Sequence, residues 1–103
     1  MNIRQATIND EADLLALMRE SHEHTRGTTT EEWLKTKAAI KTLLTDSQAG
    51  EAHLTYLTSG ELCGYIIMCR GFSLDYGGYF TWVEETYMRQ AEQERFRDQR
   101  FSP

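Results

Sequence analysis

The sequence predicts a single α/β domain of the α+β kind, with the element order β-α-α-β-β-β and a mostly antiparallel sheet. Its 103 residues suit one domain. The first half of the chain holds two polar-capped segments with apolar residues at helical spacing. The second half holds three stretches rich in β-branched and aromatic residues, separated by turns that contain glycine.

The chain is predicted to open with a short strand and a helix. Residues 2–8 alternate between two faces, which favours a strand. We expect the helix over residues 11–21, where leucines recur at positions i, i+3 and i+4. Asp10 stands just before it and can accept hydrogen bonds from the free amides of the first turn.

A polar connector over residues 21–28 separates this helix from a second one. Thr29 and Glu32 have the spacing of a capping box, in which each side chain bonds to the other residue's backbone amide. Trp33 begins the apolar face of the second helix, and Gly50 is predicted to end it.

Three strands are expected in the second half. Residues 52–58 and 62–69 form a predicted hairpin around a turn at 59–61, and the second of these strands is apolar enough to be buried on both faces. Residues 70–78 contain three glycines and indicate a loop. Residues 79–89 are dense in aromatic and β-branched side chains and predict a fourth strand.

Charge and composition exclude several classes of protein. The net charge of −5 and the absence of a basic cluster argue against a nucleic-acid binder. No apolar run is long enough to span a membrane, and the first residues contain no apolar signal segment. Cys63 and Cys69 are about 20 Å apart on one predicted strand, which is beyond disulfide reach, so we expect reduced core cysteines and a cytoplasmic protein.

Three stretches together resemble the N-terminal part of a GNAT-family N-acetyltransferase. Residues 3–7, with the helix after them, are similar to the family's first strand and first helix. The hairpin over 54–68, with Gly64 after its turn, resembles the second and third strands, and residues 83–89 resemble the acidic fourth-strand motif. The resemblance covers residues 2 to 89. It implies transfer of an acetyl group from acetyl-CoA to a small-molecule or peptide amine.

The sequence departs from the family after the fourth strand. There the family has an R/Q-x-x-G-x-G/A segment, whose backbone amides hold the pyrophosphate of acetyl-CoA. The last glycine of this chain is Gly78, and Arg89 is followed by a charged stretch without glycine. We therefore expect a truncated acetyltransferase-like domain over residues 1–89, impaired in acetyl-CoA binding, and a charged tail of high helix propensity over residues 90–103.

The resemblance also assigns candidate site residues. Glu84 is the candidate catalytic base that takes the proton of the acceptor ammonium, and Glu85 is a candidate for substrate binding. Tyr87 and Met88 stand where the family pairs strand backbone with the pantetheine arm of the cofactor. For all four residues the alternative is an ordinary structural role, a solvated acid or sheet packing.

The histidines are weaker candidates. His22 and His24 lie in the predicted connector, which borders the acceptor site in the family, and they are candidates for substrate binding. The alternative is exposed loop polarity. His53 is expected to be a surface residue, and no residue spacing indicates a metal site.

The fourth strand also raises the question of partners. If it forms the edge of the sheet, its free backbone groups and aromatic side chains favour a homodimer formed through this strand. Two functions therefore stay open at this point. One is an impaired N-acetyltransferase, and the other is a non-catalytic dimeric or partner-binding module on the same half-fold.

Overall fold

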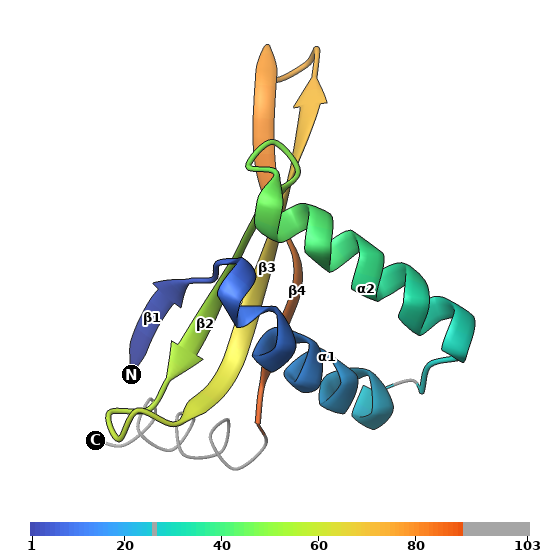
Figure 1. The fold of residues 1–103 in the computed structure, drawn as a ribbon. Helices are drawn as coiled ribbons and strands as arrows, with labels where there is room; N and C mark the ends of the chain where they lie inside the picture. Colours follow the sequence, from blue (N-terminus) through green and yellow to red (C-terminus); the bar gives the residue numbers. More distant parts are fainter. Residues whose placement is uncertain (26, 90–103) are drawn as a thin grey trace.

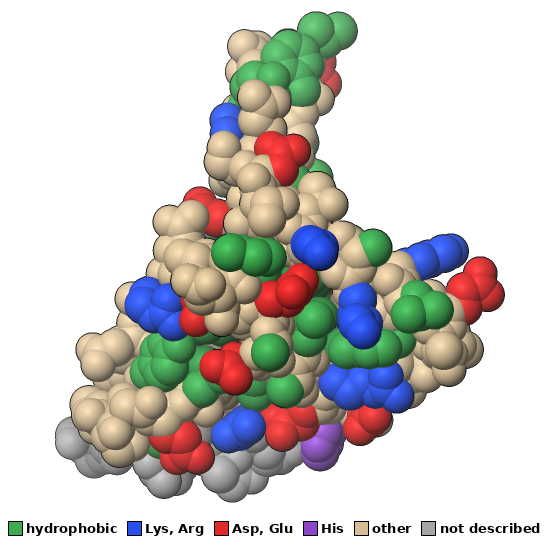
Figure 2. All heavy atoms as spheres, viewed as in Figure 1, with side chains coloured by type: hydrophobic (Ala, Val, Ile, Leu, Met, Phe, Trp, Pro, Cys, Tyr) green, Lys and Arg blue, Asp and Glu red, His purple; other side chains and the backbone are tan. Residues whose placement is uncertain are grey.

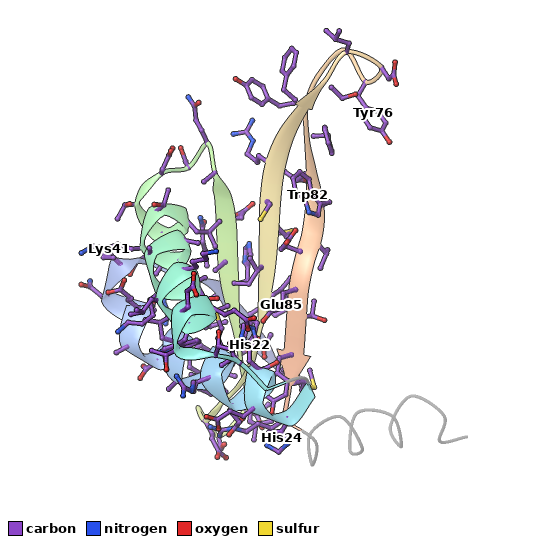
Figure 3. All side chains as sticks on the ribbon, turned by 90° about the vertical axis from the view of Figure 1, so that its right-hand side faces the viewer. His22, His24, Lys41, Tyr76, Trp82 and Glu85 are labelled. Carbon is purple, nitrogen blue, oxygen red and sulfur yellow. The ribbon has the colours of Figure 1, made fainter. Side chains whose placement is uncertain are left out.

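The computed structural model describes residues 1–25 and 27–89 and confirms the predicted fold class. A four-stranded antiparallel sheet has the strand order β1-β2-β3-β4. Helices α1 and α2 cover one face of it, so the domain has two layers (Figures 1 and 3). The elements are β1 (Asn2–Gln5), α1 (Glu11–Thr25), α2 (Thr30–Thr45), β2 (Gly50–Tyr56), β3 (Leu62–Ser73) and β4 (Gly78–Met88).

The first strand is shorter than predicted because a capped turn follows it. β1 ends at Gln5, and Thr7 caps a single 3-10 turn over Ile8–Asp10. The carboxylate of Asp10 accepts from the backbone amide of Thr7 at 2.8 Å and from both terminal nitrogens of Arg4 at 2.8 and 2.9 Å. These contacts fix the angle at which the chain enters α1.

Helix α1 is longer than predicted and extends through Thr25. The expected connector over 21–28 is therefore wrong in its first half, and His22 and His24 lie on a helix rather than in a loop. An ion pair at i, i+4 between Arg19 and Glu23, 2.9 Å apart, supports the added turn. The sequence did not predict this last turn of α1, because the residues that it buries are Ser21 and His22 instead of leucines.

Helix α2 begins at the predicted capping box but ends earlier than expected. The Thr29 hydroxyl accepts from the backbone amide of Glu32 at 3.1 Å, and the Glu32 carboxylate accepts from the amide of Thr29 at 3.3 Å. The helix ends at Thr45, whereas Gly50 is the first residue of β2. Its φ of 145° and the closeness of the Met68 carbonyl oxygen, which a Cβ would strike, explain the glycine there.

The core lies between the helices and the centre of the sheet. Leu14 on α1 and Leu54 on β2 are completely buried, and β3 is buried on both faces near its start, as predicted. Cys63 and Cys69 are both free, also as predicted. The buried apolar residues are Ala6, Leu14, Leu17, Met18, Ile40, Leu43, Ala52, Leu54, Cys63, Tyr65 and Ile67.

The outer parts of β3 and β4 project beyond the core as a two-stranded arm, which we define as residues 70–82 (Figure 1). The loop predicted over 70–78 is wrong, since only the turn between Ser73 and Gly78 leaves the two strands. Gly71, one of the glycines behind that prediction, lies inside β3 under an aromatic cover. A Cβ on it would come within 2.9 to 3.2 Å of the rings of Trp82 and Phe80.

Two further expectations concern the C-terminal tail and the absence of a membrane-spanning segment. The charged tail over 90–103, and with it the division of the chain at residue 89, lies outside the described residues. Of the helices that the structure describes, none has the length and apolar character needed to cross a membrane.

Candidate functional site

Strand β4 contains a bulge at the two neighbouring acids. Ile67 of β3 pairs with Glu85, and the next residue, Met68, pairs with Val83, so Glu84 is the extra residue between them. A bulge re-aims the side chains beside it and is common next to functional sites. Here the two acids receive different environments. Glu84 is exposed, whereas Glu85 turns towards the helices and is half-buried.

Glu85 forms the centre of a polar cluster with His22 and Tyr65, which we call the Glu85 cluster. Nε2 of His22 lies 3.0 and 3.2 Å from the two carboxylate oxygens, and the Tyr65 hydroxyl donates to one of them. His22 and Tyr65 are 3% and 1% exposed, whereas the Glu85 side chain is 26% exposed. Figure 3 shows His22 and Glu85 pointing towards one another from α1 and β4. Solvent therefore reaches this cluster through the carboxylate.

The hydrogen bonds of the cluster meet at the Glu85 carboxylate. An ionised carboxylate has no proton to donate, so its partners there are donors: Nε2 of the imidazole and the hydroxyl of the phenol. Burial, and next the hydrogen bond to Glu85, raise the pKa of Tyr65 well above its ordinary value, so the phenol keeps its proton. The other imidazole nitrogen, Nδ1 of His22, is buried and has no hydrogen-bond partner among the described residues.

A second polar contact joins α1 to the end of β4. The Tyr87 hydroxyl donates to Glu20 at 3.0 Å, and Nε of Arg89 donates to the same oxygen at 3.3 Å. Arg89 also donates to the backbone carbonyl of Leu62 at 3.2 Å. Burial and the hydrogen bond to Glu20 raise the pKa of Tyr87. The Tyr87 side chain thus serves the helix–sheet contact, which leaves only its backbone for the cofactor contact predicted from the resemblance.

The candidate residues on β4 occupy distinct places. Glu84 accepts a hydrogen bond from the indole nitrogen of Trp82 at 2.6 Å on the exposed side of the strand. Met88 is half-buried at the end of β4, opposite Gly64 of β3. The predicted roles of both residues stay predictions. His22 contacts Glu85, the neighbour of Glu84, through both carboxylate oxygens.

The histidines separate into one buried and two outer residues. His22 belongs to the Glu85 cluster, whereas His24 is exposed and lies apart from it (Figure 3). His53, which we expected at the surface, is half-buried on β2, and its Nε2 lies 3.1 Å from Oε2 of Glu51. Within residues 1–25 and 27–89, no three side chains of the metal-binding types gather into a group.

Sequence reasoning missed Tyr65, which completes the cluster. It stands in the apolar run of β3, between Gly64 and Ile66, and was part of a strand expected to be buried. A buried tyrosine requires a hydrogen-bond partner for its hydroxyl, and that requirement was the available signal. The partner could not be named from the sequence, because it depends on the register of β3 against β4.

No protein-family model and no curated protein sequence matches the chain. Solved structures do match it. An integron cassette protein from the mobile metagenome of Cole Harbour Salt Marsh is 29% identical, with a TM-score of 0.76 over 86% of this chain and 57% of that one. A possible acetyltransferase from Clostridium difficile 630 is 19% identical, with a TM-score of 0.71 over 95% of this chain and 66% of that one.

A third match is a ribosomal-protein-alanine N-acetyltransferase from Brucella melitensis biovar Abortus 2308. It is 18% identical, with a TM-score of 0.63 over 90% of this chain and 60% of that one. The chain therefore spans 57 to 66% of the length of these three proteins. At these identities the likeness shows the fold, and the fold is GNAT-like, as the sequence predicted.

Proposed function

From this GNAT-like fold, we propose that the chain takes part in the transfer of an acetyl group from acetyl-CoA to an amine. The amine nitrogen attacks the thioester carbonyl, the C–N bond forms, and the thiolate of CoA leaves and is protonated. An amine is an ammonium ion at neutral pH, so a base must first remove one proton. The observation that carries the proposal is the pair of acids at the β4 bulge, one exposed and one held by His22 and Tyr65.

The two acids are suited to different tasks. Glu84 is exposed, so an ammonium group can reach it directly or through one water, and the indole of Trp82 orients its carboxylate. We assign the base to Glu84 on this ground. Glu85 is held in place by two donors from buried residues and exposes only part of its carboxylate. That arrangement suits a fixed negative charge that attracts and orients the acceptor ammonium, with His22 as its support.

The cofactor would lie along β4. Among the described residues β4 is an edge strand, so its backbone groups at Tyr87 and Met88 are available to the amide groups of the pantetheine arm. The pyrophosphate of the cofactor would find fewer backbone amides to bind, because residues 79–103 contain no glycine. Each lost charge-assisted hydrogen bond would cost about 1.5–3 kcal/mol of binding free energy. We therefore expect weak binding of acetyl-CoA.

Calorimetric titration of the 103-residue protein with acetyl-CoA and with CoA tests the proposal first. We expect measurable binding with a Kd below about 1 mM, the upper end of ordinary substrate affinities. Acetylation of a panel of amines then compares the wild type with Glu84→Gln and Glu85→Gln. Glu84→Gln should lower kcat and keep cofactor binding, and Glu85→Gln should mainly raise the KM for the amine. The absence of heat up to millimolar acetyl-CoA would contradict the proposal.

A second candidate function is a non-catalytic module that binds a protein partner. The arm favours it, because Phe72, Leu74 and Tyr76 are 63 to 88% exposed. Large apolar residues that are grouped on a surface often mark a site of interaction with another protein. Association with a protein partner in the absence of any binding of acetyl-CoA would favour this function over acetyl transfer.

A further inference from the structure

The arm presents apolar side chains that nothing in the described structure covers. Figure 2 shows hydrophobic side chains gathered at its outer end. The residues of the arm and its base that are large, hydrophobic and exposed are Phe72, Leu74, Tyr76, Tyr79, Trp82 and Val83. A two-stranded hairpin that packs against no third element is only marginally stable in water. The arm therefore has the properties of half of an interface.

Within the part of the chain that the structure describes, no strand pairs with the outer edge of β4 along the arm. The 11 residues of β4 contain neither lysine nor proline, the residues that usually block pairing at an edge. The only bulge in its pairing with β3 lies at Glu84, beyond the arm. Between Gly78 and Val83 the strand carries no charge at all. Another strand can pair there without meeting an unfavourable side chain.

The arm is a neutral part of an acidic chain. The whole chain has a net charge of −5, whereas the arm carries only Arg70 and Asp75, whose charges cancel. Two copies therefore meet less like-charge repulsion at the arm than elsewhere on their surfaces. The 14 residues after Arg89 include six charged side chains, so their composition does not suit an aromatic surface.

We propose that a second copy of this chain binds the arm, with the two β4 strands antiparallel about a two-fold axis at Thr81. In this register Phe80 of each copy faces Trp82 of the other, and Tyr79 faces Val83. Glu84 faces Gly78. Apolar residues thus meet apolar residues, and cross-strand pairs of this kind stabilise a sheet. An axis moved to Glu84 would place like charges opposite one another, which is destabilising.

This inference does not depend on acetyl transfer, and it supplies the partner for the second candidate function. Sedimentation velocity of the full chain over a range of concentrations tests it. We expect a reversible dimer. Thr81→Lys and Thr81→Glu each place two like charges at the axis, and each should weaken dimerisation by about tenfold or more. An equimolar mixture of the two variants should restore the dimer, because opposite charges then meet at the axis.

Leu34→Lys is the matched control, since Leu34 is 58% exposed on α2, away from the arm. It should dimerise as the wild type does, and circular dichroism should show all variants folded. A wild-type protein that stays monomeric at a concentration of about 1 mM would overturn the proposal, because even a dimer with a weak Kd would be populated at that concentration. So would Thr81 variants that dimerise normally, or a mixture that associates no better than its components. None of these results would affect the titration with acetyl-CoA, so the two proposals fail separately.

Discussion

Nε2 of His22 lies 3.0 Å from Oε2 of Glu85, and this contact joins helix α1 to strand β4 across 63 positions of sequence. Two residues earlier on α1, Glu20 accepts from Tyr87 at 3.0 Å. The inner half of β4 is therefore held against α1 by polar side chains, whereas the outer half projects in the arm. The bulge at Glu84 lies where these two halves meet.

Replacement of Glu85 by glutamine should destabilise the fold, and the same change at Glu84 should not. Nε2 of His22 lies within 3.2 Å of both carboxylate oxygens. Whichever oxygen the amide NH2 group replaces, the imidazole N–H would therefore face another donor. Leaving such a buried donor unsatisfied costs about 1–3 kcal/mol. Glu84 is exposed, so Glu84→Gln should change the free energy of unfolding by less than about 0.5 kcal/mol. Urea denaturation of both variants measures the difference, and equal effects would contradict this account of the cluster.

Asp10 should make the fold sensitive to acid. Its hydrogen bonds from Arg4, with the backbone amide of Thr7, lower its pKa from 3.8 to about 2 in the folded state. The unfolded chain therefore takes up the proton first as the pH falls, so the stabilisation is complete above about pH 4. It is lost as the pH falls towards 2. Wild type should exceed Asp10→Asn in stability by about 1 kcal/mol at pH 7, and the gap in thermal midpoint should close by pH 2. A gap of constant size over this range would show that the ionised carboxylate is not responsible.

Much of the fold could be predicted from local sequence signals. The capping box at Thr29 and Glu32, the leucines of α1 and the dense aromatic residues of β4 each specify their own element, and the structure contains all three. The element order followed from them. The GNAT-like resemblance then followed from the order and spacing of these elements, although none of the stretches is specific when taken alone.

The parts that could not be predicted depend on tertiary contacts. Glycine at 71 indicates a loop by propensity, yet it lies in β3 because the rings of Trp82 and Phe80 occupy the space of a side chain. His22 indicates a polar connector, yet it is buried because Glu85, which also accepts from Tyr65, provides a partner for its Nε2. The alternation of side chains along a strand predicts that Glu84 and Glu85 point to opposite faces. The bulge at Glu84 could not be predicted, because it depends on the register of β3 against β4.

Gly64 should tolerate no side chain. A Cβ there would strike the backbone carbonyl oxygen of Tyr87 and come within 2.9 Å of the Thr55 hydroxyl. Backbone cannot move aside without breaking the pairing of β3 with β4, so Gly64→Ala should cost about 3 kcal/mol or more. Gly71→Ala is the control, because the same methyl group there meets only the ends of two aromatic rings on the arm. It should cost clearly less by chemical denaturation, and the reverse order would contradict the packing described for Gly64.

Tyr65 should make the fold sensitive to alkali. Its pKa is raised in the folded state by burial and by the hydrogen bond to Glu85, whereas in the unfolded chain it lies near 10. The unfolded chain therefore loses the phenolic proton first, so stability from Tyr65 is present below about pH 10 and falls above it, by up to about 1.4 kcal/mol per pH unit. Tyr65→Phe should be less stable than wild type at pH 8, since it leaves Glu85 without one donor. The difference should shrink at pH 11, because phenylalanine cannot ionise. Lysine ionisation is common to both proteins and cancels in the comparison. Urea midpoints at the two pH values measure this change, and parallel losses in both proteins would show that Tyr65 does not hold its proton in the fold.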